Sequence, residues 1–195
     1  MGQLIKLLAK SIKFDGFKKE NQIWRKNIGI LTQIIEIQSS KYNSEVRESF
    51  TINIGIFSAK VHEMTWVKDV PVKPKEIDCI FRKRVSYFLD NQGDKWWMLQ
   101  NEQDVEMLIP EIIGIFEKSI QPFFSKIDNY DSLYLILKDL DDADANYPLF
   151  KIQLACLSIL IGKQSNGTAM LEDVKKDPVW GENAVKVLNN LGLPS

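Results

Sequence analysis

One stretch, FTINIGIF at residues 50–57, alternates between large apolar side chains and small or polar ones from Phe50 to Ile56. Successive side chains of a β-strand point to opposite faces of its sheet, so a period of two predicts a strand. One face then carries Phe50, Ile52, Ile54 and Ile56, and the other carries Thr51, Asn53, Gly55 and Phe57. A glycine inside such a strand indicates a bulge or the close approach of another backbone segment.

Neighbouring segments extend this strand into a sheet. Residues 30–39 are the strongest candidate, because apolar and β-branched residues interleave with polar ones. Residues 23–26 form a short candidate strand before a turn at 27–29. Residues 77–88 begin as a fourth strand, and their end is read as either extended or helical. Residues 61–76 contain two prolines and no sustained period, so we expect a long loop there. Strands joined by hairpin-length loops predict an antiparallel sheet of about four strands.

Helical periodicity marks the two ends of the chain. Apolar residues at helical spacing predict an amphipathic helix over about residues 4–13, and everything after Asn101 reads as helical. An apolar stripe from 105 to 124 predicts a long helix, which Pro110 and Pro122 limit or kink and which covers Ile52, Ile54 and Ile56. The predicted fold class is therefore α+β, with an α+β domain at residues 1–125 and a C-terminal helical extension at residues 126–195 packed on it.

Composition narrows the classes of partner. The chain of 195 residues has 25 Lys and Arg against 26 Asp and Glu, a formal net charge of −1. Proteins that bind the phosphate backbone are usually far more basic, so no nucleic acid partner is expected. No apolar run reaches the roughly 18 residues of a membrane span. Cys79 and Cys156 lie in apolar runs, which predicts buried free thiols and a cytoplasmic location.

Several short pieces occur in an order that is similar to a known family. They are Gly16-Phe17-Lys18 with Trp24-Arg25, Gln38-Ser39-Ser40, the strand from Phe50 to Ile56, Asp78-Cys79 with Arg82 and Arg84, and Trp96-Trp97. In this order they resemble the bacterial family named the domain of unknown function 4304, over roughly residues 1–125. This chain has Ile80 where family members often have His after the Cys. The resemblance implies a bacterial cytoplasmic α+β protein with no established activity, and small families of this kind suggest an immunity-like or accessory role by analogy.

No arrangement of residues predicts catalysis. The single histidine, His62, reads as a surface loop residue, and Cys79 reads as a core thiol rather than a nucleophile. Asp142, Asp144 and Asn146 have the first spacings of a calcium loop, but the glycine and the bidentate glutamate that such a loop requires are missing, which favours a solvated acidic linker. We therefore expect no catalytic residues, no metal and no cofactor.

The most promising surface is the polar face of the sheet. Strand periodicity places Glu36 with Gln38, Asn53 with Thr51, and Arg82 with Arg84 on one face if these strands are neighbours. Two arginines on one side of a strand can hold a carboxylate or a phosphate together. The alternative is a solvated face in which Glu36 pairs with an arginine. Trp97, near a loop, is a further candidate for partner binding, with core packing as its alternative.

Two functional hypotheses follow. The first is a non-catalytic binding module for a protein partner, with a possible immunity-like or accessory role. The second is a binder of a small anionic ligand, or an enzyme, that uses the Arg, Asn and Glu side chains of the polar face. A flat surface would favour the first hypothesis, and a pocket with converging polar groups would favour the second. The oligomeric state is left open.

Overall fold

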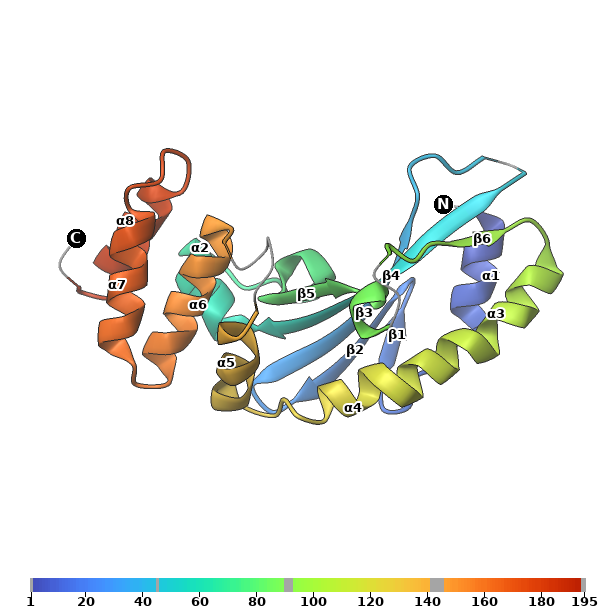
Figure 1. Ribbon diagram of the computed structural model, residues 1–195, viewed down its shortest axis with the longest axis horizontal. Helices are drawn as coiled ribbons and strands as arrows, with labels where there is room; N and C mark the ends of the chain where they lie inside the picture. Colours follow the sequence, from blue (N-terminus) through green and yellow to red (C-terminus); the bar gives the residue numbers. More distant parts are fainter. Residues whose placement is uncertain (1, 45, 90–92, 141–145, 194–195) are drawn as a thin grey trace.

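The computed structural model describes residues 2–44, 46–89, 93–140 and 146–193. Within these residues an antiparallel sheet runs in the order β1-β2-β3-β4-β5, and β6 pairs with another part of β4. The strands are β1 (Lys18–Glu20), β2 (Ile23–Ile28), β3 (Leu31–Ser39), β4 (Glu48–Ser58), β5 (Phe81–Arg84) and β6 (Trp97–Leu99). The predicted α+β class and antiparallel sheet are confirmed (Figure 1). The strand count exceeds the predicted four because β1 and β6 have only three residues each, too few to show a period.

The long central strands follow the alternation of the sequence. β3 and β4 pair along their length, from Leu31 opposite Ser58 to Ser39 opposite Phe50. β2 and β3 are joined by a two-residue turn in which Gly29 has a positive φ of 55°. That backbone conformation is easily adopted only by glycine, which explains the tight turn.

The segment after β4 differs from its prediction. Part of the expected loop at 61–76 is the helix α2 (Ala59–Trp66), whose first turn is capped by the Ser58 hydroxyl accepting a hydrogen bond from the Val61 N–H at 3.2 Å. The expected strand at the beginning of 77–88 starts later, after the helical turn η1 (Glu76–Asp78), and is limited to β5. The helical alternative for the end of this segment is confirmed by the helical turn η2 (Val85–Phe88). α2 is only eight residues long, which is too short for a helical period to show clearly in the sequence.

Seven further helices complete the regular structure of the described chain. They are α1 (Gln3–Ser11), α3 (Glu102–Ile115), α4 (Gln121–Phe124), α5 (Tyr130–Lys138), α6 (Pro148–Leu160), α7 (Gln164–Val174) and α8 (Gly181–Asn190). α3 and α4 are joined without a break by the π-helical turn η3 (Phe116–Ile120). The predicted long helix is thus present, and its irregular turn directly precedes Pro122, whose ring and missing N–H disfavour a regular α-helix.

The core lies on one face of the sheet. Trp24, Ile35, Ile52, Ile54 and Ile56 are all buried and belong to one cluster with α1 and the α3–η3–α4 helix. Ile52 lies beside Ile112, Phe116 and Ile120, so the predicted cover by the long helix is confirmed. The Gln33 amide also donates to the Phe124 carbonyl at 3.1 Å, which ties this helix to β3.

The C-terminal helices gather at one end of the sheet, opposite α1 (Figure 1). α2 is their attachment point, because it contacts both α6 and α8. The Asn183 amide of α8 donates to the Thr65 carbonyl of α2 at 3.0 Å. The boundary near residue 125 stays a prediction. Asp142 and Asp144, of the acidic linker, lie outside the described residues.

Candidate functional site

The strand register brings the predicted polar residues onto one face. Glu36 of β3 lies opposite Asn53 of β4, and Asn53 lies opposite Arg84 of β5. Arg82 lies opposite Gly55 on the same strand pair, and Gln38 opposite Thr51. The shared face inferred from the alternation is therefore confirmed.

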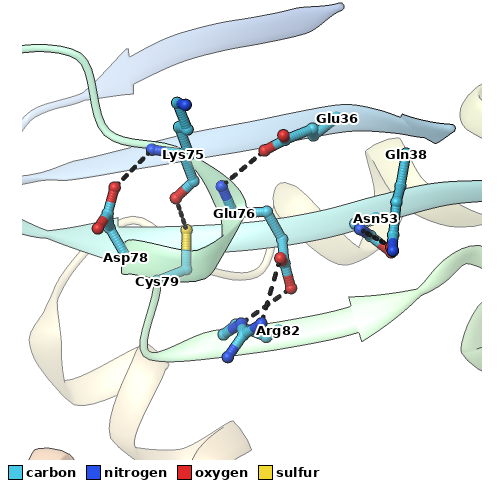
Figure 2. Close-up of polar contacts among 8 residues, drawn as sticks. All are labelled: Glu36, Gln38, Asn53, Lys75, Glu76, Asp78, Cys79 and Arg82. Atoms are coloured by element: carbon cyan, nitrogen blue, oxygen red, sulfur yellow. Dashed lines mark hydrogen bonds and ion pairs between the residues drawn. The ribbon is translucent and has the colours of Figure 1, made fainter. Parts of the chain in front are cut away.

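A chain segment crosses this face and covers part of it. The Glu36 carboxylate accepts a hydrogen bond from the Glu76 N–H at 2.9 Å, at the start of η1 (Figure 2). The Cys79 thiol donates to the Lys75 carbonyl at 3.4 Å, and Sγ lies directly over Gly55. The close approach expected at Gly55 is thus confirmed. Beneath the segment, Cys79 packs with Ile34 and Phe57 in a small apolar cluster of its own.

Both arginines are held in fixed positions. Arg82 donates from Nε and Nη2 to the two oxygens of Glu76, at 2.9 and 3.3 Å (Figure 2). Arg84 forms an ion pair with Asp94 and lies 5.4 Å from the ring of Trp96. Fixed guanidinium groups lose little side-chain freedom when they bind a further anion.

An amide pair lies next to the arginines. Asn53 donates from Nδ2 to Gln38 Oε1 at 2.9 Å (Figure 2), and Asn53 is only 7% exposed. This bond uses one donor and one acceptor of the two amides. Asn53 Oδ1 and Gln38 Nε2 form no further hydrogen bond with the residues that the structure describes.

These side chains form one wall of a cleft of about 490 Å³. The other wall comes from Leu140, Tyr147 and the beginning of α6, at the open edge of β5. The cleft is lined by Gln38, Asn53, Glu76, Ile77, Cys79, Ile80, Arg82, Lys83, Arg84, Leu140, Tyr147, Leu149, Phe150 and Gln153. This volume lies within the range of pockets that bind small molecules, about 300–1,000 Å³.

The α6 wall was not predicted, and Gln153 is its most unusual member. Gln153 is only 7% exposed, and within the described residues its amide forms no hydrogen bond. A single Gln inside the apolar sequence IQLACL, residues 152–157, is a usable signal for a buried polar site. Tyr147 and Phe150 carried no comparable signal, because aromatic residues at a helix start are ordinary core residues.

Two predicted site residues lie apart from the cleft. Trp97 is 4% exposed, its ring stacks on Phe50 at 5.3 Å, and its Nε1–H donates to Glu111 at 3.0 Å. It is a core residue of the opposite sheet face, because β6 pairs with the beginning of β4. Glu36 lies on the polar face but is covered by η1 instead of lining the cleft or pairing with an arginine.

The prediction that His62 is a surface loop residue is wrong. His62 lies in α2, is 4% exposed, and packs between the rings of Phe57 and Trp66. Burial lowers its pKa, although the charge and the backbone of Asp78 oppose that effect. Burial also raises the pKa of the Cys79 thiol well above its usual value, which is the reverse of what an activated nucleophile needs.

The described residues contain neither a cluster of metal ligands nor a membrane-spanning helix. Among them no three His, Cys, Asp or Glu side chains are grouped as metal ligands would be. No helix in this part of the chain has the length and apolar character needed to cross a membrane. Cys79 and Cys156 are both buried and unpaired, as expected.

Comparison with known proteins gave one match. A family model described as "Domain of unknown function (DUF4304)" matches residues 8–126, more than half of the chain. No curated protein and no solved structure matches. The matched span contains the wall with Gln38, Asn53, Arg82 and Arg84, whereas the α6 wall lies beyond its end.

Proposed function

The chain belongs to the DUF4304 family, and we propose that it is a non-catalytic binding module whose cleft receives an anionic group of a small ligand. One observation carries this proposal. Arg82 and Arg84 share a cleft with Asn53 and Gln153, two amides that are each more than nine-tenths buried. A concave site into which a small number of polar groups converge is typical of small-molecule recognition.

The charge of the lining favours an anion. Among the described lining residues, the two guanidinium groups of Arg82 and Arg84 face the cleft together with one carboxylate, that of Glu76. Arginine presents planar N–H donors that match the oxygens of a carboxylate or a phosphate. The first turn of α6 adds to this, since the Leu149 and Phe150 amides precede its first backbone hydrogen bond, from Lys151 to Tyr147.

Binding without catalysis is supported by the engagement of the two nearest carboxylates among the described residues. The Glu36 carboxylate accepts from the Glu76 N–H and does not line the cleft, and both oxygens of the Glu76 carboxylate, which does line it, accept from Arg82. A general base must reach the proton it removes, either directly or through one water.

The test uses inorganic phosphate and citrate as probes in a two-dimensional NMR titration. The side-chain amides of Gln38, Asn53 and Gln153 report directly on the cleft. We expect their signals to move, and we expect Arg84→Ala to weaken binding at least tenfold. Arg47→Ala is the matched control, because Arg47 lies in the β3–β4 connection away from the cleft. Binding that is equally strong in wild type and Arg84→Ala, or the absence of any shift, would overturn the proposal.

A protein partner is the second candidate. Its supporting observation is an exposed apolar residue in the cleft lining, Ile77, which is 69% exposed. Such a partner, in an immunity-like or accessory role in a bacterial cytoplasm, would place an acidic side chain in the cleft. A purified partner captured by wild type but not by Arg82→Ala/Arg84→Ala would support this candidate. Equal capture by both forms would contradict it.

A further inference from the structure

The two walls of the cleft have different chemistry. The sheet wall carries the cationic groups, and the α6 wall carries aromatic and aliphatic side chains with one amide, Gln153. A ligand that touches both walls must join an anion to a flat or apolar body. Inorganic phosphate would contact the first wall alone.

Gln153 says most about the chemistry of the flat or apolar part of the ligand. The Gln153 amide is open to the cleft, because it is not one of the solvent-excluded polar atoms without a partner, and a helix of this apolar character would accept Leu at the same position. An amide offers one acceptor and a donor pair side by side. Its natural complement is a ring edge with an adjacent donor and acceptor, as in a nucleobase.

The aromatic side chains of the same wall provide a stacking surface. Tyr147 is 51% exposed at the mouth of the cleft, and its ring packs edge-on against Trp180 at 5.9 Å. Phe150 lines the cleft one turn further along α6. An aromatic ring held in place by a neighbour is a suitable surface for a planar base.

We infer that the ligand is a nucleoside monophosphate or a close analogue, with its phosphate near Arg82 and Arg84 and its base between Tyr147 and Gln153. This inference rests on the function proposed above and names the ligand class for the same cleft. The chain's net charge of −1 favours a free mononucleotide over a nucleic acid strand. In this arrangement the C-terminal helices outside the family match supply the groups that recognise the base.

The test compares AMP, GMP, CMP and UMP with ribose 5-phosphate, adenosine and phenyl phosphate by isothermal titration calorimetry on the full chain. We expect at least one of the four nucleotides to bind ten or more times tighter than ribose 5-phosphate or phenyl phosphate. Gln153→Leu should remove that advantage while ribose 5-phosphate binding stays unchanged. Because this amide forms no hydrogen bond with the described residues, the melting temperature of Gln153→Leu should stay close to that of wild type. Gln164→Leu, at an exposed position of α7, is the control and should bind as wild type does.

The outcomes separate the two proposals. If ribose 5-phosphate binds as tightly as every nucleotide, the ligand class is wrong and the anion site stands. If phenyl phosphate matches the best nucleotide, or if Gln153→Leu keeps the full preference, recognition of the base edge by Gln153 is overturned. If no phosphate compound binds, the proposed function falls together with this inference.

Discussion

Gly55 and Cys79 lie so close together that a Cβ atom on Gly55 would stand 2.5 Å from the Cys79 Sγ and 3.1 Å from its Cβ. Gly55 is in the middle of β4, and Cys79 directly follows η1. The absent side chain allows the segment that forms one edge of the cleft to rest on the sheet. The cleft therefore depends on a glycine that touches no ligand.

Gly55→Ala should destabilise the fold. The added methyl group meets the thiol and cannot move, because the central strand is paired on both sides. We expect a loss of about 1–3 kcal/mol in the free energy of unfolding, which is typical of overpacking. Urea denaturation followed by tryptophan fluorescence measures this change.

Cys79 provides the control for the same contact. Cys79→Ala removes Sγ, so the double variant Gly55→Ala/Cys79→Ala should lose clearly less than the sum of the two single losses. Gly55→Ala/Cys79→Ser keeps an atom at the Sγ position, so it should recover less of the lost stability than Gly55→Ala/Cys79→Ala. Simple additivity in the first double variant would show that the contact does not limit the packing.

Glu48 should stabilise the first helix. Its buried carboxylate accepts hydrogen bonds from the Leu4 and Ile5 N–H groups at 3.1 and 2.9 Å, at the beginning of α1. Glu48→Ala removes both acceptors, and we expect a loss of about 1–3 kcal/mol in unfolding free energy. Glu48→Gln keeps one oxygen and should lose less. The control is Glu106→Ala, on the exposed side of α3, which should stay within about 0.5 kcal/mol of wild type. A Glu48→Ala variant as stable as this control would contradict the capping role.

Val67 should be a site where substitution stabilises the protein. It ends α2 with φ 48° and ψ 46°, a left-handed conformation that a β-branched residue rarely adopts. Val67→Gly removes the clash of Cβ and should raise the unfolding free energy by about 1 kcal/mol. Val67→Ala keeps Cβ and should gain less. Differential scanning calorimetry of the three proteins measures the effect, and a lower melting temperature for Val67→Gly would contradict it.

The sheet could be predicted because its decisive property is local. A period of two in residues 30–39 and 50–57 identifies both long strands and the face of each side chain. The same alternation predicts that Asn53, Arg82 and Arg84 share one face, without knowledge of the pairing register of the strands. It could not find β1 or β6, since three residues do not establish a period.

The second wall of the cleft could not be predicted in the same way. α6 reaches the edge of β5 through contacts of α2 with α6 and α8, which join segments about 90 to 120 residues apart, as between Thr65 and Asn183. No local pattern reports such docking. The environment of His62 was misjudged for the same reason, because the prolines at 71 and 74 concealed a short helix packed on the C-terminal half.

His62 should make the stability of the fold depend on pH. It is the only histidine of the chain, and its Nδ1 is buried with no hydrogen-bond partner among the residues described. Burial lowers its pKa in the folded state, Lys68 lowers it further, and Asp78 partly opposes both. In the unfolded chain the imidazole titrates near its ordinary value of about 6.5. Between that value and the lowered folded pKa, the unfolded chain therefore binds more protons than the folded one. The contribution of this group to stability is fully present above pH about 6.5 and is lost as the pH falls through that window.

Urea unfolding at a series of pH values between about 5 and 8 measures this dependence, because carboxyl groups contribute mainly below that range. Wild type should lose stability as the pH falls below about 6.5, and His62→Gln, which does not titrate, should show a flatter profile. The comparison uses the slope, so a constant cost of the substitution itself does not affect it. Identical slopes for the two proteins would mean that protonated His62 is tolerated in the folded state.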